Sequence, residues 1–150
     1  MISDFIRNFI DRNIGNITKI RNKYYLADKE LLELKQKIKH EPEYIGLFLG
    51  EEMKNGFKPS PALIDEIAKI SGRKVFVNDK GEWLFLCGRD IFGKSITKAN
   101  ANGGFVLVQS MKDENLGYGK IVGNITNKER IVVKNLLDKG EYLRREMTKK

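Results

Sequence analysis

The sequence predicts an α+β fold, with a mixed helix-and-strand part in residues 1–72 and a small, closed or nearly closed β-structure in residues 73–150. Apolar residues recur at helical spacing in the first part, whereas the second part contains short apolar segments separated by turn residues. Ten of the fourteen glycines lie from Gly72 onward. A chain of 150 residues has room for one ordinary domain or two small ones.

Two helices are expected early in the chain. Apolar residues follow a helical spacing from Ile2 to Ile14, and Ser3 is placed to cap the first turn. Asp28 is placed to cap a second helix. The apolar residues that share one face of this second helix are Leu31, Leu34 and Ile38.

Two strands and a third helix complete the first part. The segments Lys23–Ala27 and Tyr44–Met53 have strand character. Ser60 followed by Pro61 is typical of a helix start, because serine caps helices and proline suits the first helical position. Gly72 is expected to end this helix in a left-handed conformation.

Five short strands are expected in the second part. They are Lys74–Val77, Trp83–Cys87, Phe105–Ser110, Gly119–Val122 and Arg130–Leu136. The triplet Asp79-Lys80-Gly81 is a candidate hairpin turn between the first two strands. Asp138 and Glu141 have the spacing of a capping box for a final short helix. Because wrapping short strands round removes exposed sheet edges, a small barrel is predicted.

The basic charge of the chain is concentrated in the second part. The chain carries 28 Lys and Arg against 20 Asp and Glu, a formal net charge of +8. Residues 1–72 contain 12 basic and 11 acidic residues, a net +1, and residues 73–150 contain 16 basic and 9 acidic residues, a net +7. A polyanionic partner such as nucleic acid is therefore expected there. Basic surfaces also serve solubility, so charge alone leaves both explanations open.

The residue types favour binding over catalysis. The only histidine, His40, lies in a polar link, and the only cysteine, Cys87, lies in an apolar segment where a buried thiol is expected. Glu51 and Glu52 are neighbours on a predicted strand and point to opposite faces. The segment Gly117-Tyr118-Gly119 lacks the third glycine of a dinucleotide fingerprint and is expected to be a turn. We expect no enzyme activity and no cofactor, while a magnesium site made only of carboxylates stays open.

The sequence shows no targeting or membrane-spanning pattern. Its longest apolar runs, Trp83–Cys87 and Phe105–Val108, are far shorter than the roughly 20 residues that cross a bilayer. The first residues interleave charged and apolar side chains, unlike a signal peptide. A single cysteine agrees with a reducing compartment. We therefore expect a cytoplasmic protein, or a nuclear and nucleolar one if the source is eukaryotic.

The last third of the chain resembles the end of a PUA domain, a pseudo-barrel named after pseudouridine synthases and archaeosine transglycosylases. The matching pieces occur in order and are Gly104–Met111, Leu116–Gly119 and Asp138–Arg144. With Lys74–Val77 and Lys94–Thr97, these pieces resemble most the NIP-seven family of large-ribosomal-subunit biogenesis factors. The first part is similar, more diffusely, to the α/β domain that precedes the PUA domain in that family. The Lys- and Ile-rich composition suggests an archaeal member.

This resemblance implies an α/β pre-PUA domain in residues 1–72 followed by an RNA-binding PUA pseudo-barrel in residues 73–150. It implies a non-catalytic protein that binds pre-rRNA or other single-stranded RNA in ribosome biogenesis. The first domain would contact ribosome-assembly or RNA-processing proteins.

Two alternatives remain open. The chain could be an accessory RNA-binding subunit of an RNA-modification enzyme, such as a pseudouridine synthase or an archaeosine transglycosylase. That role needs a catalytic aspartate, for which Asp65 and Asp90 would be tested, or a partner subunit that supplies the chemistry. A scaffold that binds only proteins is the third option, and it leaves the uneven charge unexplained.

The resemblance also implies an RNA-binding surface made of the loop and short helix after the second strand of the barrel and of the C-terminal helix. The residues that these regions carry are Arg89, Lys94, Lys98, Asn100, Asn102, Gly103, Arg144, Arg145 and Lys149. Arginine and lysine suit phosphate oxygens, so backbone contacts with little base readout are expected. The asparagines could touch base edges. Phe92 and Tyr118 could each stack a base or simply pack against the barrel.

Overall fold

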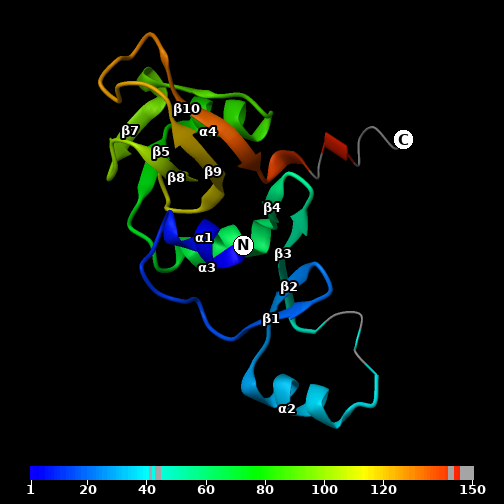
Figure 1. The fold of residues 1–150 in the computed structure, drawn as a ribbon. Coiled ribbons are helices and arrows are strands. Elements are labelled where there is room, and N and C mark those ends of the chain that lie inside the picture. Colours follow the sequence, from blue (N-terminus) through cyan, green and yellow to red (C-terminus); the bar gives the residue numbers. More distant parts are fainter. Residues whose placement is uncertain (41, 43–44, 142–143, 146–150) are drawn as a thin grey trace. The chain divides into compact units, whose positions relative to one another are not determined.

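A computed structural model describes residues 1–40, 42, 45–141 and 144–145 of the chain and confirms the α+β fold class (Figure 1). The chain divides into two compact units, Met1–Lys69 and Ile70–Lys150. Within the described residues, no helix is long and apolar enough to cross a membrane.

The first unit contains a four-stranded antiparallel sheet in the order β1-β2-β3-β4. Its strands are β1 (Ile17–Ile20), β2 (Lys23–Leu26), β3 (Leu47–Met53) and β4 (Gly56–Pro59). Its helices are α1 (Ile2–Arg7), α2 (Lys29–Lys37) and α3 (Pro61–Ala68). Helix α3 lies against β3, and its Leu63, Ile64 and Ile67 are fully buried.

Two predicted helix caps of the first unit are confirmed. The Asp28 carboxylate accepts the backbone N–H of Leu31 at 2.8 Å and starts α2. The Ser60 hydroxyl accepts the backbone N–H of Leu63 at 3.2 Å, with Pro61 in the first turn of α3. Each side chain satisfies one of the backbone N–H groups that a helix start leaves without a partner.

The predicted extent of the first and third helices is wrong. Helix α1 ends at Arg7, and Ser3 makes no cap, because Met1 occupies the cap position. The Asn8 side chain donates to the carbonyls of Asp4 and Phe5, which ends the helix early. Phe9 and Ile10 are buried although they lie beyond the end of α1. Their apolar character therefore reflects packing in the core and does not indicate a longer helix. Helix α3 ends at Ala68 with Lys69 as its cap, and Gly72 is not left-handed.

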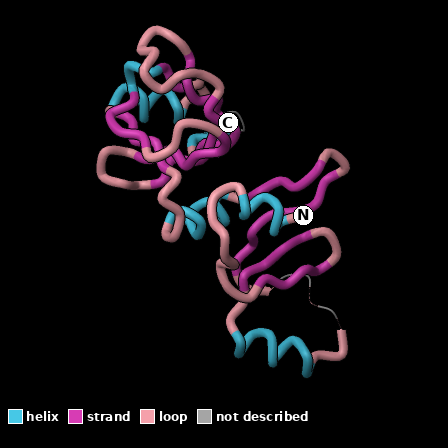
Figure 2. The backbone as a smooth tube through the Cα atoms, turned by 60° about the vertical axis from the view of Figure 1, so that its left-hand side comes forward, coloured by secondary structure: helices cyan, strands magenta, loops and turns pink. Residues whose placement is uncertain are grey.

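The second unit is a six-stranded sheet that wraps into a nearly closed barrel (Figure 2). The strand order is β6-β10-β9-β8-β5-β7, and β5 and β8 form the one parallel pair of the described sheet. The strands are β5 (Lys74–Val77), β6 (Ile91–Phe92), β7 (Ile96–Ala99), β8 (Gly104–Gln109), β9 (Asn115–Ile121) and β10 (Ile131–Asp138). Between β5 and β6 lies helix α4 (Asp79–Leu86), and a short 3-10 turn, η1 (Gly93–Ser95), joins β6 to β7.

Apolar side chains fill the barrel. The buried residues that form this core are Val75, Val77, Phe85, Ile91, Val106, Val108, Leu116, Ile121, Val132 and Val133. Apart from Phe85 on α4 they all come from strands, so the core depends on contacts between segments far apart in sequence. The described residues Gly140, Glu141, Arg144 and Arg145 are helical, as predicted for the segment after β10.

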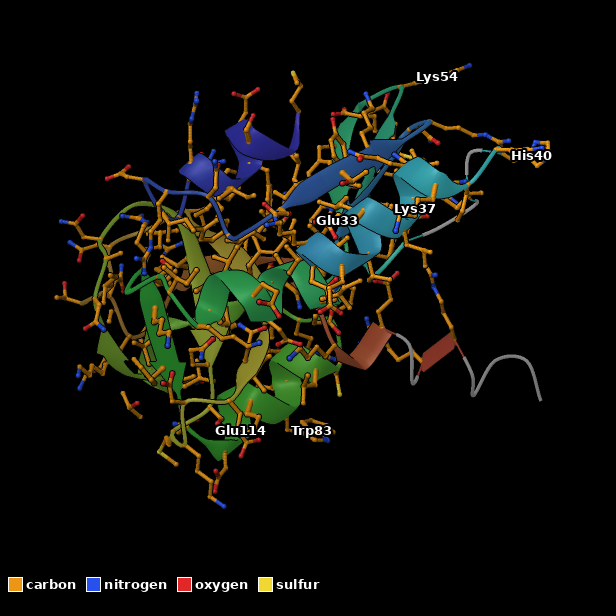
Figure 3. The ribbon with its side chains drawn as sticks, turned by 90° about the horizontal axis from the view of Figure 1, so that it is seen from below. Glu33, Lys37, His40, Lys54, Trp83 and Glu114 are labelled. Atoms are coloured by element: carbon orange, nitrogen blue, oxygen red, sulfur yellow. The ribbon has the colours of Figure 1, made fainter. Side chains whose placement is uncertain are left out.

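The predicted strand Trp83–Cys87 is wrong, because this segment belongs to α4 and its C-terminal cap. The side chain of Asn78 accepts the backbone N–H of Gly81 at 2.9 Å and starts the helix, so Asp79-Lys80-Gly81 is a first helical turn and not a hairpin turn. Only one face of the apolar run is buried. Trp83 is 65% exposed and projects into solvent (Figure 3), and Cys87 is exposed where a buried thiol was expected.

The segment Gly117-Tyr118-Gly119 lies in β9 and is not a turn, which corrects a second prediction. Gly117 adopts φ 143°, and a Cβ at this position would collide with the carbonyl oxygen of Leu137 on β10. Glycine is therefore required here for the close approach of two strands.

Candidate nucleic-acid interface

The surface of the second unit carries many exposed cations. The exposed basic residues of its described part are Lys80, Arg89, Lys94, Lys98, Lys112, Lys120, Lys128, Arg130, Lys134 and Arg145. Within this described set, Arg145 has an ion-pair partner, Glu141, and the other nine have none. Exposed cations without carboxylate partners are free to neutralise an external polyanion.

Backbone pairing joins the segment after α4 to the loop before β10. The N–H of Gly93 donates to the carbonyl of Arg130, and the N–H of Lys94 donates to the carbonyl of Lys128, both at 3.1 Å. Phe92 pairs with Ile131 in the adjoining ladder. A Cβ at Gly93 would collide with the Asn127 carbonyl, so this close contact requires glycine. The pairing carries Lys128 and Arg130 beside Lys94, more than thirty positions away in sequence.

An exposed aromatic ring lies among these cations. The Phe92 side chain is 39% exposed, and the Lys94 ammonium lies 5.8 Å from the centre of its ring. Phe92 and Ile131 line a shallow cleft of about 340 Å³ whose rim includes Gly88 and Arg89. We call Arg89, Phe92, Lys94, Lys128 and Arg130 the Phe92 surface. An exposed ring beside cations is the combination that single-stranded nucleic acids bind by stacking and phosphate contact.

The side chain of Asn135 on β10 is hydrogen-bonded to the segment that lines this cleft. Its amide donates to the carbonyls of Phe85 at 3.0 Å and Arg89 at 3.3 Å, and to the Asp138 carboxylate at 3.2 Å. The backbone N–H of Asn135 donates to the Asp90 carboxylate at 2.8 Å. Asp90 is therefore a positioning group of the α4–β6 turn, and one of its oxygens is occupied by this bond.

The second predicted region extends from β7 to the loop before β8. Lys98 on β7 is exposed and lies 5.8 Å from the centre of the Phe76 ring. Asn100 and Asn102 are exposed and line a second shallow cleft with Ile125. Asn100 and Asn102 thus share one cleft, to which Lys98 does not belong, and this cleft has no lining residue in common with the cleft beside Phe92.

Gly103 has a structural contact. Its carbonyl accepts the guanidinium of Arg73, whose Nε also donates to the carbonyl of Phe105 at 3.1 Å. Gly104, which follows, adopts φ 72°. Arg73 therefore fixes the end of this loop, and Asn100 and Asn102 remain its outward-facing polar groups.

Arg144 is bound within the barrel. Its guanidinium donates to the two carboxylate oxygens of Asp138 at 2.9 and 3.2 Å and to the carbonyl of Leu86. The hydrogen bond with Asp138 raises the pKa of Arg144 above its ordinary value. Arg145 pairs with Glu141 at 2.6 Å, and Lys149 lies outside the described residues. The RNA contacts of these three residues stay predictions.

Tyr118 packs within the protein. It is 8% exposed and forms an edge contact with Phe105, with ring centres 6.0 Å apart. Burial raises the pKa of its hydroxyl to about 12. Of the two aromatic residues considered for base stacking, Phe92 is the one that solvent reaches.

The described residues hold no group of three His, Cys, Asp or Glu side chains that could bind a metal ion. His40 is exposed and projects into solvent near the end of α2 (Figure 3). Glu51 and Glu52 are adjacent on β3, and Glu52 accepts the Tyr24 hydroxyl at 2.8 Å. This bond and burial both contribute to raising the pKa of Tyr24, with burial the larger cause.

Sequence reasoning missed Lys128 and Arg130, which the structure adds to Arg89 and Lys94. Neither residue belongs to the regions that the resemblance implied, and their segment has no local pattern that marks a site. The signal available was Lys128 and Arg130 at the start of the predicted strand Arg130–Leu136, and this signal becomes informative only when the β6–β10 pairing is known.

The chain matches a family model and is similar to two archaeal relatives. A family model described as the UPF0113 PUA domain matches residues 73–147. A UPF0113 protein from Archaeoglobus fulgidus is 36% identical over 115 residues, which cover 71% of this chain and 65% of the relative. A UPF0113 protein from Aeropyrum pernix is 39% identical over 103 residues, which cover 67% of this chain and 56% of the relative. The matched segment thus spans less than two thirds of either relative.

One solved structure supports the fold. A conserved PUA domain protein from Thermoplasma acidophilum superposes with a TM-score of 0.53 at 19% identity, covering 69% of this chain and 72% of that one. This likeness agrees with the nearly closed barrel described above.

Proposed function

The chain belongs to the UPF0113 PUA domain family, and from this premise we propose that it is a non-catalytic RNA-binding protein that acts in maturation of large-subunit rRNA. PUA domains are typical of RNA-binding proteins. In this proposal, residues 73–150 form the PUA domain and residues 1–72 a pre-PUA domain like that of the NIP-seven family. The finer assignment rests on the resemblance of both parts of the sequence to that family.

The observation that carries RNA binding is the Phe92 surface. It has one exposed aromatic ring, with the Lys94 ammonium beside it and Arg89 on the same open cleft. Backbone pairing adds the segment that carries the exposed cations Lys128 and Arg130. The cations would contact phosphates, which fixes an RNA strand in place without reading its sequence. Phe92 would stack a base, which every base permits because each has a flat face. We therefore expect single-stranded RNA to bind with low sequence selectivity and strong salt dependence.

The experiment that tests RNA binding compares two double variants with the same change in net charge. Lys128→Ala with Arg130→Ala removes two cations of the Phe92 surface, whereas Lys80→Ala with Lys112→Ala removes two exposed cations elsewhere on the barrel. Affinity for a labelled single-stranded RNA is measured by fluorescence anisotropy across a salt series. The first variant should lower the salt slope by about one for each lost phosphate contact.

Equal losses in the two double variants would contradict a localised surface and indicate diffuse attraction by net charge. Absence of salt-sensitive binding by the unmodified protein would contradict the proposed function itself.

The role in rRNA maturation needs a separate test. Crosslinking in cells followed by sequencing of the attached RNA should enrich pre-rRNA. Enrichment of tRNA alone would favour the accessory subunit of an RNA-modification enzyme. Modified nucleosides formed in RNA by this chain alone would contradict a non-catalytic role.

The first unit is proposed to contact ribosome-assembly or RNA-processing proteins. Its near-neutral charge, +1 for residues 1–72, supports a protein partner over a polyanion. Crosslinks from this unit predominantly to RNA would contradict that assignment.

A further inference from the structure

Two lysines lie opposite each other in the middle of the barrel sheet. Lys120 on β9 pairs directly with Lys134 on β10. Residues paired in this way have Cβ atoms about 5 Å apart on the same face of the sheet. Both side chains are exposed, and neither has an ion-pair partner among the described residues.

This arrangement is unfavourable for folding. Like charges directly opposite each other on neighbouring strands destabilise a sheet, and lysine is depleted in strands. The positions two residues away on the same strands offer no acid to offset the repulsion. They are Tyr118 on β9, Val122 directly after β9, and Val132 and Leu136 on β10.

The usual structural reason for a strand lysine does not apply here. Lysines often protect edge strands against pairing with another chain. In this sheet, however, β9 lies between β8 and β10, and β10 lies between β9 and β6. Neither lysine therefore lies on an outermost strand of the sheet, and the two face each other across the β9–β10 ladder.

We propose that Lys120 and Lys134 form a binding site for the phosphate backbone of RNA, in addition to the Phe92 surface. Two ammonium groups on one face can share a phosphate or bind two consecutive phosphates, and the bound anion would cancel their mutual repulsion. The site lies about 10 Å along β10 from Ile131, which lines the cleft beside Phe92. One RNA strand could therefore reach both sites. This inference rests on the proposed RNA-binding function and extends the surface over the sheet.

The test uses Lys120→Thr with Lys134→Thr, because threonine is favoured in strands and carries no charge. The matched control for the double variant is Lys80→Ala with Lys112→Ala, which removes the same charge from α4 and from the exposed loop between β8 and β9. Each single strand variant is compared with Lys112→Thr. Affinity for single-stranded RNA is measured by fluorescence anisotropy between about 50 and about 200 mM salt. Thermal unfolding is measured at low salt in the same buffers.

We expect the double variant to lower the salt slope by about two, and each single strand variant by about one. Its melting temperature at low salt should equal or exceed that of the unmodified protein, because the repulsion is removed. Lys120→Arg with Lys134→Arg should retain RNA affinity, which separates loss of charge from loss of packing. A lysine pair needed only for structure would instead lower the melting temperature and leave the salt slope unchanged.

Three outcomes would overturn the inference. If the double variant binds RNA as well as Lys80→Ala with Lys112→Ala does, the inferred site is contradicted while the proposed function stands. Loss of RNA affinity in Lys120→Arg with Lys134→Arg would show that the positive charge of the pair does not determine binding. Absence of RNA binding by the unmodified protein removes the proposed function and this inference together. If the double variant does not fold, the two single variants test the inference instead. Salt slopes equal to that of the unmodified protein would then contradict the site.

Discussion

The carboxylate of Asp138 accepts two hydrogen bonds from the guanidinium of Arg144, at 2.9 and 3.2 Å, at the junction of β10 and the helix that follows it. Asp138 is 5% exposed, so these bonds and the one from Asn135 replace the water that its carboxylate loses on burial. The arginine predicted for RNA contact thus has a structural task within the barrel.

Arg144→Ala should destabilise the protein. Hydrogen bonds to a charged group contribute about 1.5–3 kcal/mol each, and the buried Asp138 would lose two of them. Because Arg144 is 42% exposed, solvent screening reduces the effect, and we expect a loss of about 2 kcal/mol in unfolding free energy. Chemical denaturation measures this loss. The control, Arg145→Ala, breaks an exposed pair and should cost about 0.3–0.5 kcal/mol. Equal effects in the two variants would contradict the structural role.

Phe92→Ala should weaken RNA binding without unfolding the barrel. The ring is 39% exposed, so its removal leaves the core intact, whereas a stacked base contributes about 1–3 kcal/mol to binding. Met111→Ala removes another exposed apolar side chain and serves as the control. Fluorescence anisotropy should show a roughly tenfold loss or more for Phe92→Ala and little change for Met111→Ala. Retained affinity in Phe92→Ala would remove stacking from the proposed surface.

The stability of the protein should fall at alkaline pH through Tyr118. Burial raises the pKa of Tyr118 from 10.0 to about 12 in the folded protein. Between these values the unfolded chain releases the proton and the folded protein retains it, so unfolding becomes more favourable by up to about 1.4 kcal/mol per pH unit. Spectrophotometric titration should show Tyr118 ionising near pH 12, and Tyr118→Phe should remove that phase and flatten the alkaline loss of stability. Ionisation of all tyrosines near pH 10 would contradict burial of Tyr118.

Gly117→Ala should be far more destabilising than Gly103→Ala. A Cβ at Gly117 would collide with the Leu137 carbonyl, and φ is 143°, whereas a Cβ at Gly103 meets nothing within 4 Å. Backbone strain alone costs about 1–3 kcal/mol, so we expect a loss of at least about 2 kcal/mol in unfolding free energy for Gly117→Ala. Gly103→Ala should remain within about 0.5 kcal/mol of the unmodified protein. Thermal or chemical unfolding of both variants tests the contrast, and similar stabilities would contradict the close β9–β10 approach.

Local signals in the sequence predicted the elements that local chemistry determines. Asp28 and Ser60 were identified as helix caps because a capping side chain acts within three residues. Strand β5 was predicted at its observed bounds, because its apolar residues are bounded by turn residues. By contrast, Trp83–Cys87 has the apolar composition of a buried strand, and the cap at Asn78 that makes it a helix was not recognised.

The candidate site depends on pairing that no local pattern encodes. Arg89 and Lys94 were expected from the family resemblance, but Lys128 and Arg130 join them only through the bonds between Gly93 and Arg130 and between Lys94 and Lys128. Lys120 and Lys134 likewise lie opposite each other only because of the register in which β9 pairs with β10 at these positions. Sequence composition shows that the net positive charge lies in residues 73–150, while the strand register determines which cations lie next to each other.

Asn135 connects separate segments of the second unit through its hydrogen bonds. One side chain ties the end of α4 at Phe85, the turn at Arg89 and the carboxylate of Asp138, while its backbone N–H is bonded to Asp90. A ligand that contacts Arg89 therefore contacts a segment that Asn135 joins to Asp138 at the end of β10. Amide exchange in these distant segments should slow in concert when RNA occupies the cleft.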